Sequence, residues 1–317
     1  MLSDGSTGVW VVSTFAPAND TEFGVDLTYG LVALEIAGAK RVIVDVTNNG
    51  GGDITLGCAA AYFLSPWKSR SCYHYDIRLP NVTAQILKAA HAESKRNATF
   101  DAKIFNITGY GRDEGSFEAM MDPHELIDGA RLIRRGGEYA RYSAIFTLDH
   151  ECKRAIDIVT NSSALPQLKR GWDVKNLVVV SNGFCGSTCS NFVRTLRDKR
   201  GIKTFTYGGP TGAPFQPTAF EGGLVVTYDE LSLSLATDIP NAPHVDRLAF
   251  PIRGRIPFFE IYPDADPKGQ GAPAEWVEQV SEFHVDGVQP TLPESVWEGV
   301  RRQWVGRKDK GGLFKQD

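Results

Sequence analysis

VVVSNGFCGSTCSNF, residues 178–192, passes from a β-branched apolar run into a turn of small residues and then into a helical pattern. This order predicts a buried strand, a sharp corner and a helix, with Ser187 at the start of the helix. Unpaired backbone N–H groups at a helix N-terminus favour negative charge, and a nucleophilic serine needs such donors for the oxyanion that it creates. The simpler interpretation is that Ser187 only caps the helix, because serine is a preferred N-cap residue.

A second stretch has the same layout nearer the N-terminus, where RVIVDV at 41–46 runs into TNNGGGD at 47–53. The apolar run is typical of a buried strand, and three consecutive glycines end it because each costs about 0.5–1 kcal/mol in a regular element. The glycines predict either a flexible loop or a rigid turn whose N–H groups point into a cleft. Asp45, inside the strand, needs a partner because burying an unpaired carboxylate is costly.

Strand and helix patterns alternate at both ends of the chain, which predicts an α/β fold with a parallel sheet. The expected elements are strands at 9–15, 41–46, 176–180, 202–207, 224–228 and 248–252, and helices at 23–37, 54–64, 187–199 and 294–304. Between them, the region after Pro66 is more polar and has helical patterns at 84–94, 118–135 and 154–168. We therefore expect a mainly helical lobe inserted into the α/β core.

The corresponding domain boundaries divide the core into two segments. We predict the first part of the core at 1–65, the inserted lobe at 66–173, the second part of the core at 174–290, and a C-terminal helix and tail at 291–317.

The overall charge does not suggest a polyanionic partner. The 317 residues carry a formal net charge of −4 and have a pI near 5.9, which does not favour nucleic acid or an anionic membrane. No apolar run approaches the roughly 18 residues that span a bilayer. We expect no metal and no cofactor, and no signal peptide is visible in the polar first residues, 1–7.

Five cysteines in a chain of this length do not suggest a disulfide framework. Cys185 and Cys189 flank Ser187, and without a second metal-type pair they are expected to be small side chains packed around the turn. N-glycosylation acceptor motifs favour a secretory ancestry. They begin at Asn19, Asn81, Asn97, Asn106 and Asn161.

In this order, the two stretches resemble the tail-specific (C-terminal processing) serine protease family and its interphotoreceptor retinoid-binding relatives. The family carries an Asp-x-Arg-x-Asn-x-Gly-Gly element after a core strand, and residues 45–52 match it with Thr47 in place of Arg and Gly50 in place of Pro. A later Asn-x-x-x-small-Ser element is matched by residues 182–187. The resemblance covers about half of the chain.

The resemblance implies a ClpP/crotonase-like ββα core in which Ser187 is the nucleophile. It also implies an oxyanion hole shared between the glycine turn, at Gly51 or Gly52, and the amide of Thr188. The substrate it implies is a peptide or protein.

The general base departs from the family pattern. Bacterial members place a Lys in the glycine loop after the nucleophile helix, and residues 208–216 contain none. The fungal-type branch, with Cys beside the serine, uses a Ser-His-Glu arrangement whose His precedes the first core strand. The first histidine here is His74, so either a histidine of the lobe replaces that base or the base is missing. Glu275 resembles the Glu of a Pro-x-Glu-aromatic element of that branch, and Glu260 is a second candidate acid.

Three functions stay open. The first is a serine endopeptidase that cleaves a protein or peptide precursor, with maturation of a ribosomally made peptide toxin as a narrower form. The second is a degenerate relative that binds a peptide or small ligand without catalysis. The third, an α/β-hydrolase, is disfavoured because Cys189 stands where the Gly-x-Ser-x-Gly motif has its second glycine.

Overall fold

The chain forms two compact units, which we describe separately. The first contains residues 1–69, 155–220 and 278–317, and the second contains residues 70–154 and 221–277. The computed structural model describes residues 1–65, 73–97, 110–112, 123–161, 168–209, 213–221, 223–237, 239–243, 255–263, 266 and 268–309.

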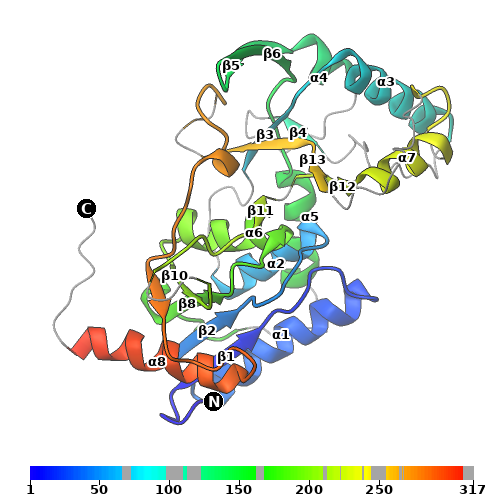
Figure 1. The fold of residues 1–317 in the computed structure, drawn as a ribbon. Helices are drawn as coiled ribbons and strands as arrows, with labels where there is room; N and C mark the ends of the chain where they lie inside the picture. Colours follow the sequence, from blue (N-terminus) through cyan, green and yellow to red (C-terminus); the bar gives the residue numbers. More distant parts are fainter. Residues whose placement is uncertain are drawn as a thin grey trace. The chain divides into compact units, whose positions relative to one another are not determined.

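The first unit is built on a parallel sheet of five strands (Figure 1). In spatial order the strands are β1 (Thr7–Val11), β2 (Arg41–Asp45), β8 (Leu177–Ser181), β10 (Lys203–Tyr207) and β15 (Phe283–Val285). Successive side chains of a strand point to opposite faces, so the unbroken apolar runs of β2 and β8 require cover on both sides.

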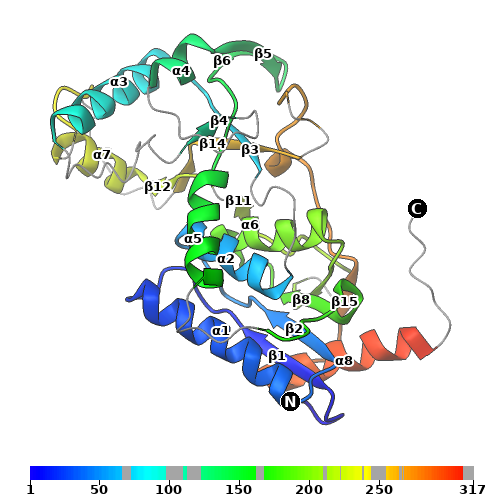
Figure 2. The ribbon, with the colours of Figure 1, turned by 180° about the vertical axis from the view of Figure 1, so that it is seen from behind.

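Helices supply that cover on both faces (Figures 1 and 2). Val42 and Val44 pack in one apolar cluster with side chains of α1, α2 and α6, whereas Ile43 packs in another with side chains of α8. The helical segments of this unit are α1 (Asp20–Ile36), α2 (Ile54–Leu64), η2 (Val174–Asn176), α6 (Thr188–Arg194), its π-helical continuation η3 (Thr195–Lys199) and α8 (Pro293–Asp309).

Side-chain caps fix where α1 and α2 begin. Asn19 accepts hydrogen bonds from the N–H groups of Thr21 and Glu22, and Asp53 accepts one from Thr55. Because Asp53 directly follows the three glycines, this cap also fixes where the glycine turn ends. The predicted α/β class and parallel core sheet are confirmed.

The second unit has a four-stranded antiparallel sheet in the order β14-β3-β7-β4, with a separate hairpin of β5 and β6 and a pair of β12 and β13. Its strands are β3 (His74–Ile77), β4 (Gly111–Arg112), β5 (Arg131–Arg135), β6 (Glu138–Tyr142), β7 (Phe146–Thr147), β12 (Val225–Thr227), β13 (Arg255–Pro257) and β14 (Phe259–Tyr262). Its helices are α3 (Asn81–Arg96), α4 (Pro123–Asp128), α7 (Tyr228–Thr237) and the short η4 (Ala274–Trp276). The chain passes between the units within α5 (Asp149–Asn161) and β11 (Phe220–Glu221).

The lobe therefore differs from the mainly helical insertion expected at 66–173. Strands make up much of its described part, and its second segment, 221–277, lies in what was assigned to the core. The helix expected at 118–135 is replaced, where described, by α4 and β5. Gly136 and Gly137, both at positive φ, join β5 to β6 in a two-residue turn that favours a hairpin. The strand expected at 248–252 lies outside the described residues.

Candidate functional site

Two turns of the first unit meet at one edge of the parallel sheet. We call residues 47–52, after β2, the glycine turn and residues 182–187, after β8, the nucleophile turn. Strands β2 and β8 are neighbours, with Val44 opposite Val179 and Asp45 opposite Val180. Because parallel strands end at the same edge, the sheet itself brings the two turns together.

Hydrogen bonds join the turns directly. The Gly186 N–H donates to the Asn49 carbonyl at 3.1 Å, and the Thr188 hydroxyl donates to the Gly52 carbonyl at 2.6 Å. The approach is close enough that a Cβ placed on Gly51 would lie 2.7 Å from the Cβ of Ser187. The tightness of this contact favours the rigid glycine turn over the flexible loop.

A pair of amide side chains adds a second link. Asn182 Nδ2 donates to Asn48 Oδ1 at 2.8 Å, while Asn182 Oδ1 accepts from the backbone N–H groups of Asn48 and Phe184. Asn182 therefore holds the start of its own turn and the neighbouring turn at once.

Ser187 stands at the N-cap position of α6 without capping it. Its side chain makes no hydrogen bond to the helix, its φ is 54° and its ψ is −125°, and the residue is partly exposed. The interpretation that Ser187 only caps the helix is therefore wrong. A non-glycine residue at such dihedral angles costs on the order of 1–3 kcal/mol and persists only where its surroundings fix it.

The backbone amides of the glycine turn have different roles. The N–H of Gly51 donates to Asn49 Oδ1 at 2.9 Å, and the carbonyl of Gly51 accepts from Phe15 at 2.9 Å. In a trans peptide the C=O and the following N–H point in opposite directions, so the Gly52 N–H points away from Phe15 and from β1. That side carries β8 and the nucleophile turn, which leaves Gly52 rather than Gly51 free to donate there.

Asn49 is fully buried and organises this arrangement. Its Nδ2 donates to the Val12 carbonyl at 2.9 Å, its Oδ1 accepts from Gly51, and its carbonyl accepts from Gly186. The family motif contains an Asn at this position, but the sequence alone gave it no role.

The partner that Asp45 needs comes from α8. Trp297 Nε1 donates to Asp45 Oδ2 at 2.6 Å, and the Thr47 N–H donates to Asp45 Oδ1 at 2.8 Å. Tyr207 donates to the Thr47 hydroxyl at 3.1 Å. Burial raises the pKa of Tyr207 and the charge of Asp45 adds to the rise, so the phenol stays a neutral donor.

Cys185 and Cys189 form a disulfide around Ser187. Both are fully buried among apolar side chains, as expected of packing residues. The expectation that they are only packing residues is wrong, because they are bonded to each other. The odd number of cysteines argued against paired thiols, yet the structure leaves no described cysteine as a free thiol.

The predicted base and acid lie in the other unit. His74 is buried at the start of β3, opposite Thr147 on β7 and Tyr262 on β14. Glu275 belongs to η4, and its Oε2 accepts the Ile261 N–H at 3.3 Å. Among the described residues, no titratable side chain hydrogen-bonds the Ser187 hydroxyl, and the roles predicted for His74 and Glu275 stay predictions.

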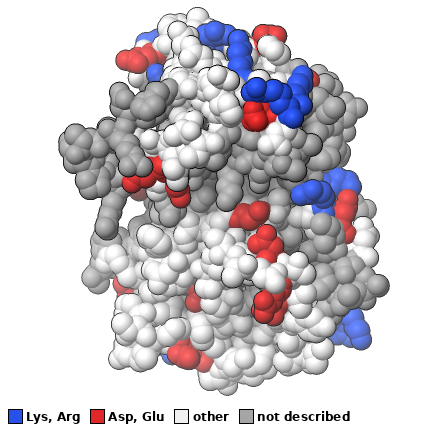
Figure 3. Space-filling view, turned by 90° about the vertical axis from the view of Figure 1, so that its right-hand side faces the viewer, with Lys and Arg blue, Asp and Glu red and all other residues white. Residues whose placement is uncertain are grey.

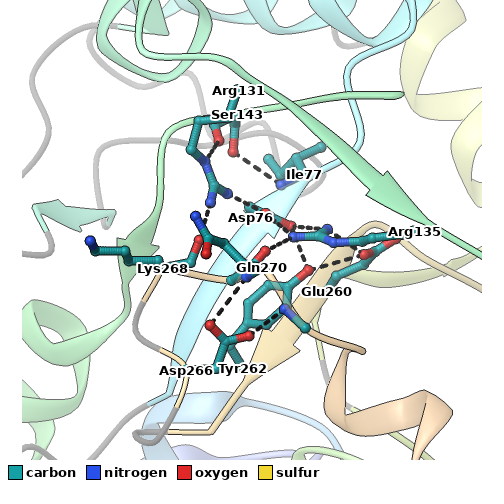
Figure 4. A network of polar contacts seen from close by, with 12 residues as sticks. Asp76, Ile77, Arg131, Arg135, Ser143, Glu260, Tyr262, Asp266, Lys268 and Gln270 are labelled. Carbon is teal, nitrogen blue, oxygen red and sulfur yellow. Dashed lines mark hydrogen bonds and ion pairs between the residues drawn. The ribbon is translucent and has the colours of Figure 1, made fainter. Parts of the chain in front are cut away.

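Glu260 belongs to a buried ion-pair cluster of the second unit (Figure 4). Asp76, which is fully buried, accepts from the guanidinium groups of Arg131 and Arg135. Arg135 also donates to Glu260 at 2.6 Å and to the Gly269 carbonyl at 2.5 Å.

Aromatic rings complete this cluster. The Arg135 guanidinium lies 3.8 Å from the centroid of the Tyr142 ring and 4.6 Å from that of Tyr262. Burial by itself lowers the pKa of Arg135, but the hydrogen bond and charge of Asp76 outweigh it and raise that pKa. Since Glu260 already accepts from Arg135 and Tyr262, it is committed to this cluster.

The described part of the chain shows neither a metal-ligand cluster nor a membrane-spanning helix. The described residues contain no group of three or more His, Cys, Asp or Glu arranged to hold a metal ion. None of the described helices is long and apolar enough to cross a membrane. On the face drawn in Figure 3, the coloured Lys and Arg side chains are scattered and form no continuous basic surface.

Comparison with known proteins agrees with the motifs. No family model matches the chain. It is 26% identical over 188 residues to the Peptidase S41 family protein ustP of Aspergillus flavus, covering 56% of this chain and 38% of that protein. It is 23% identical over 205 residues to the Peptidase S41 family protein phomP1' of Diaporthe leptostromiformis, covering 62% of this chain and 29% of that protein.

The matches thus span well under half the length of these curated relatives. Among solved structures, mature CPAF is similar at 12% identity and a TM-score of 0.46, with 98% of this chain and 54% of that chain covered. The photosystem II D1 C-terminal processing protease is similar at 14% identity and a TM-score of 0.39, with 93% and 49% covered. The resemblance to the tail-specific protease family, which the curated relatives name Peptidase S41, is confirmed.

Proposed function

We propose that this chain is a serine endopeptidase in which Ser187 forms an acyl-enzyme with the substrate. The observation that carries the proposal is the junction of the two turns. It places an uncapped hydroxyl at a partly exposed corner, against a glycine turn with an N–H directed to the same side. The fungal relatives named as peptidases support the same chemistry.

In the first step, Ser187 Oγ attacks the scissile carbonyl carbon while its proton passes to a general base. The carbonyl oxygen becomes an oxyanion, which the N–H groups of Gly52 and Thr188 stabilise. Collapse then expels the amine, which takes up the proton, and water releases the acyl group by the same route. Each preorganised donor of this kind contributes roughly 10²–10³ in rate.

For the base we retain His74, with Glu275 as its acid partner. A His74→Ala variant should lose most of its turnover, whereas a His124→Ala variant, which changes an exposed histidine of the same unit, should keep it. Equal turnover in both variants would exclude His74.

The alternative is a protein that has kept the fold of this region and lost the chemistry. The observation in its favour is that no described titratable side chain hydrogen-bonds the Ser187 hydroxyl. Such a protein would bind a peptide without cleaving it. Without a base, the amides and binding alone would leave about 10³–10⁴ over the uncatalysed rate.

A fluorophosphonate probe separates the two functions, because it forms a covalent bond only with an activated serine. We expect stoichiometric labelling of the native chain, none of Ser187→Ala, and unchanged labelling of Ser13→Ala, which removes an exposed serine of the same unit. Absence of Ser187-dependent labelling, together with retained peptide binding, would establish the alternative.

We further propose that the substrate is a ribosomally made precursor of a peptide toxin. The support is the resemblance to fungal-type members and the fungal origin of both curated relatives. Incubating the chain with a precursor encoded beside its gene, followed by mass spectrometry, should reveal discrete fragments that Ser187→Ala does not produce. A precursor that stays intact while general peptide substrates are cleaved would reject this substrate alone.

A further inference from the structure

We propose that the Cys185–Cys189 disulfide is a positioning pair for Ser187, so that the reactivity of Ser187 depends on the oxidation state of this pair. This inference rests on the proposed function, because it concerns the same hydroxyl. The bond closes residues 185–189 into a ring whose central residue is Ser187, and the two Cα atoms are 5.2 Å apart.

The ring joins two elements that differ in direction. Cys185 lies in the nucleophile turn and Cys189 lies in the first turn of α6. Ser187, between them, has a φ of 54°, a conformation that its own side chain does not stabilise by a hydrogen bond. Something outside the residue must therefore fix the corner.

Non-covalent contacts tie both sides of the ring to neighbouring segments, and on the helix side the Thr188 hydroxyl donates to the Gly52 carbonyl. Gly186 donates to the Asn49 carbonyl, Ala219 donates to the Cys185 carbonyl, and the Phe220 ring lies against Gly186. Each of these contacts runs from the ring to another segment. The disulfide joins the nucleophile turn directly to the first turn of the helix.

The side chains packed around the Cys185–Cys189 disulfide cause any change in this bond to shift the backbone. Both cysteines are fully buried in a cluster that includes Val46, Ala60 and Phe192. Two thiols need more room than a disulfide, since non-bonded sulfur atoms cannot approach to bonding distance. A close-packed interior has no such room to spare, so reduction must displace the exposed side of the ring, where Ser187 lies.

The test follows the second-order rate of fluorophosphonate labelling in three samples: the native chain, the native chain after denaturant-free reduction with a phosphine, and Cys185→Ala/Cys189→Ala. We expect labelling in the last two to be slower by roughly ten- to a hundredfold, because small misplacements of reacting groups cost rates of that order. The probe concentration at half-saturation should change little, since the change lies in placement rather than in binding.

The same double variant serves as the control for other effects of the reductant. Cys58 and Cys152 are also disulfide-bonded, so the phosphine can act on them as well. Its effect on Cys185→Ala/Cys189→Ala measures that contribution, and the native chain should be slowed by more than the variant is. Equal slowing of the native and variant chains by the phosphine, or equal labelling rates in the untreated native and variant chains, would overturn the inference.

Amide hydrogen exchange gives a readout that does not depend on catalysis. In peptides that cover residues 183–194, reduction should speed exchange, whereas peptides that cover 41–46 should not change. If no sample is labelled at Ser187, the proposed peptidase fails, and exchange alone decides the positioning role. Unchanged exchange at 183–194 would then refute it.

Discussion

The two turns of the first unit and the ion-pair cluster of the second both bury polar atoms, but they satisfy them differently. The turns are joined by backbone amides and by neutral side chains such as Asn49 and Asn182. The cluster is joined by full charges, with Asp76 and Arg135 buried at its centre.

The difference fits the roles that we propose for the two regions, a catalytic site at the turns and a structural support in the ion-pair cluster. In the cluster, each carboxylate accepts from a guanidinium and little capacity is left for a substrate. At the turns, the bonds fix the backbone without using the hydroxyl of Ser187 or the N–H of Gly52, which suits the catalytic role that we propose for them. Neutral donors also avoid the large desolvation cost that charged groups would bring to the partly buried start of α6.

The largest expected effect comes from adding one methyl group to the glycine turn. In Gly52→Ala the new Cβ would lie 2.0 Å from the Phe15 carbonyl at a φ of 143°, so the turn must shift. Labelling of Ser187 should fall by roughly 10²–10³, the cost of losing one oxyanion donor. Gly50→Ala is the matched control, since a Cβ there meets nothing within 4 Å.

Equal labelling of the two variants would show that the glycine turn has no part in the reaction. Gly51→Ala tests the same junction from the other side, because its Cβ would lie 2.5 Å from the Gly186 carbonyl. We expect this variant to lose labelling as well, by forcing the two turns apart.

Removing a charge from the second unit should have the next largest effect, on stability. Arg135→Met leaves Asp76 with only Arg131 to neutralise it, and breaking a buried pair costs about 3–5 kcal/mol. Arg96→Ala is the control in the same unit, because the Arg96 side chain is largely exposed in its pair with Glu93, and such a pair is worth about 0–1 kcal/mol. Urea unfolding followed by circular dichroism measures both.

A loss in Arg135→Met no larger than in Arg96→Ala would mean that the cluster does not hold the second unit together. Arg135→Lys sharpens the result. Lysine keeps the charge, but it cannot reproduce the fork that reaches Asp76, Glu260 and Gly269 together, so we expect only partial recovery.

The contrast between the units also explains how far the sequence could predict the fold. The parallel core was predictable because β2 and β8 are unbroken apolar runs that end at glycine-rich turns, and α2 was placed at its observed bounds, Ile54–Leu64. In the lobe, β5 mixes arginines with Leu132 and Ile133, a pattern that also suits an exposed helix. The Gly136-Gly137 turn was the available hairpin signal, and the prediction did not use it.

The candidate site was predictable in part for a similar reason. Motifs located Ser187 and the glycine turn, because both lie within short segments that follow predicted strands. The Cys185–Cys189 bond was missed because cysteine pairing depends on side-chain geometry rather than on count. The choice of Gly52 over Gly51 required knowing where the carbonyl of Gly51 points.

A smaller effect is expected from the amide pair that links the turns. Asn182→Ala removes the bonds to Asn48 and Phe184 and should cost about 0.5 kcal/mol of stability per exposed bond. Asn182→Asp keeps the two acceptor bonds and loses only the donor, so it should lie between the native chain and the alanine variant. If the fluorophosphonate labelling rates of the three chains follow the same order, the Asn182–Asn48 pair helps to position Ser187. Identical labelling rates would show that the pair has no such role.

The smallest effect concerns pH and the first unit alone. Burial raises the pKa of Glu35, but the N–H groups of residues 169–171 outweigh burial and lower it. For Asp4, burial is again opposed, here by the amides of Ser6 and Thr7 and by Arg41, and the pKa falls far below its usual range.

A carboxyl group whose pKa is lowered by folding binds fewer protons in the folded state, so its stabilisation is complete above the unfolded-state pKa of about 4. That contribution is lost as the pH falls through the lower folded-state pKa. We therefore expect the stability of the first unit to decrease below about pH 4, and Glu35→Gln to be less stable than the native chain at pH 6. Urea unfolding from pH 6 down to about pH 2 should show a constant difference above about pH 4 and converging curves below it, because protonated Glu35 is equivalent to the glutamine. Curves that stay parallel over the whole range would mean that the bonds from residues 169–171 to the Glu35 carboxylate contribute nothing.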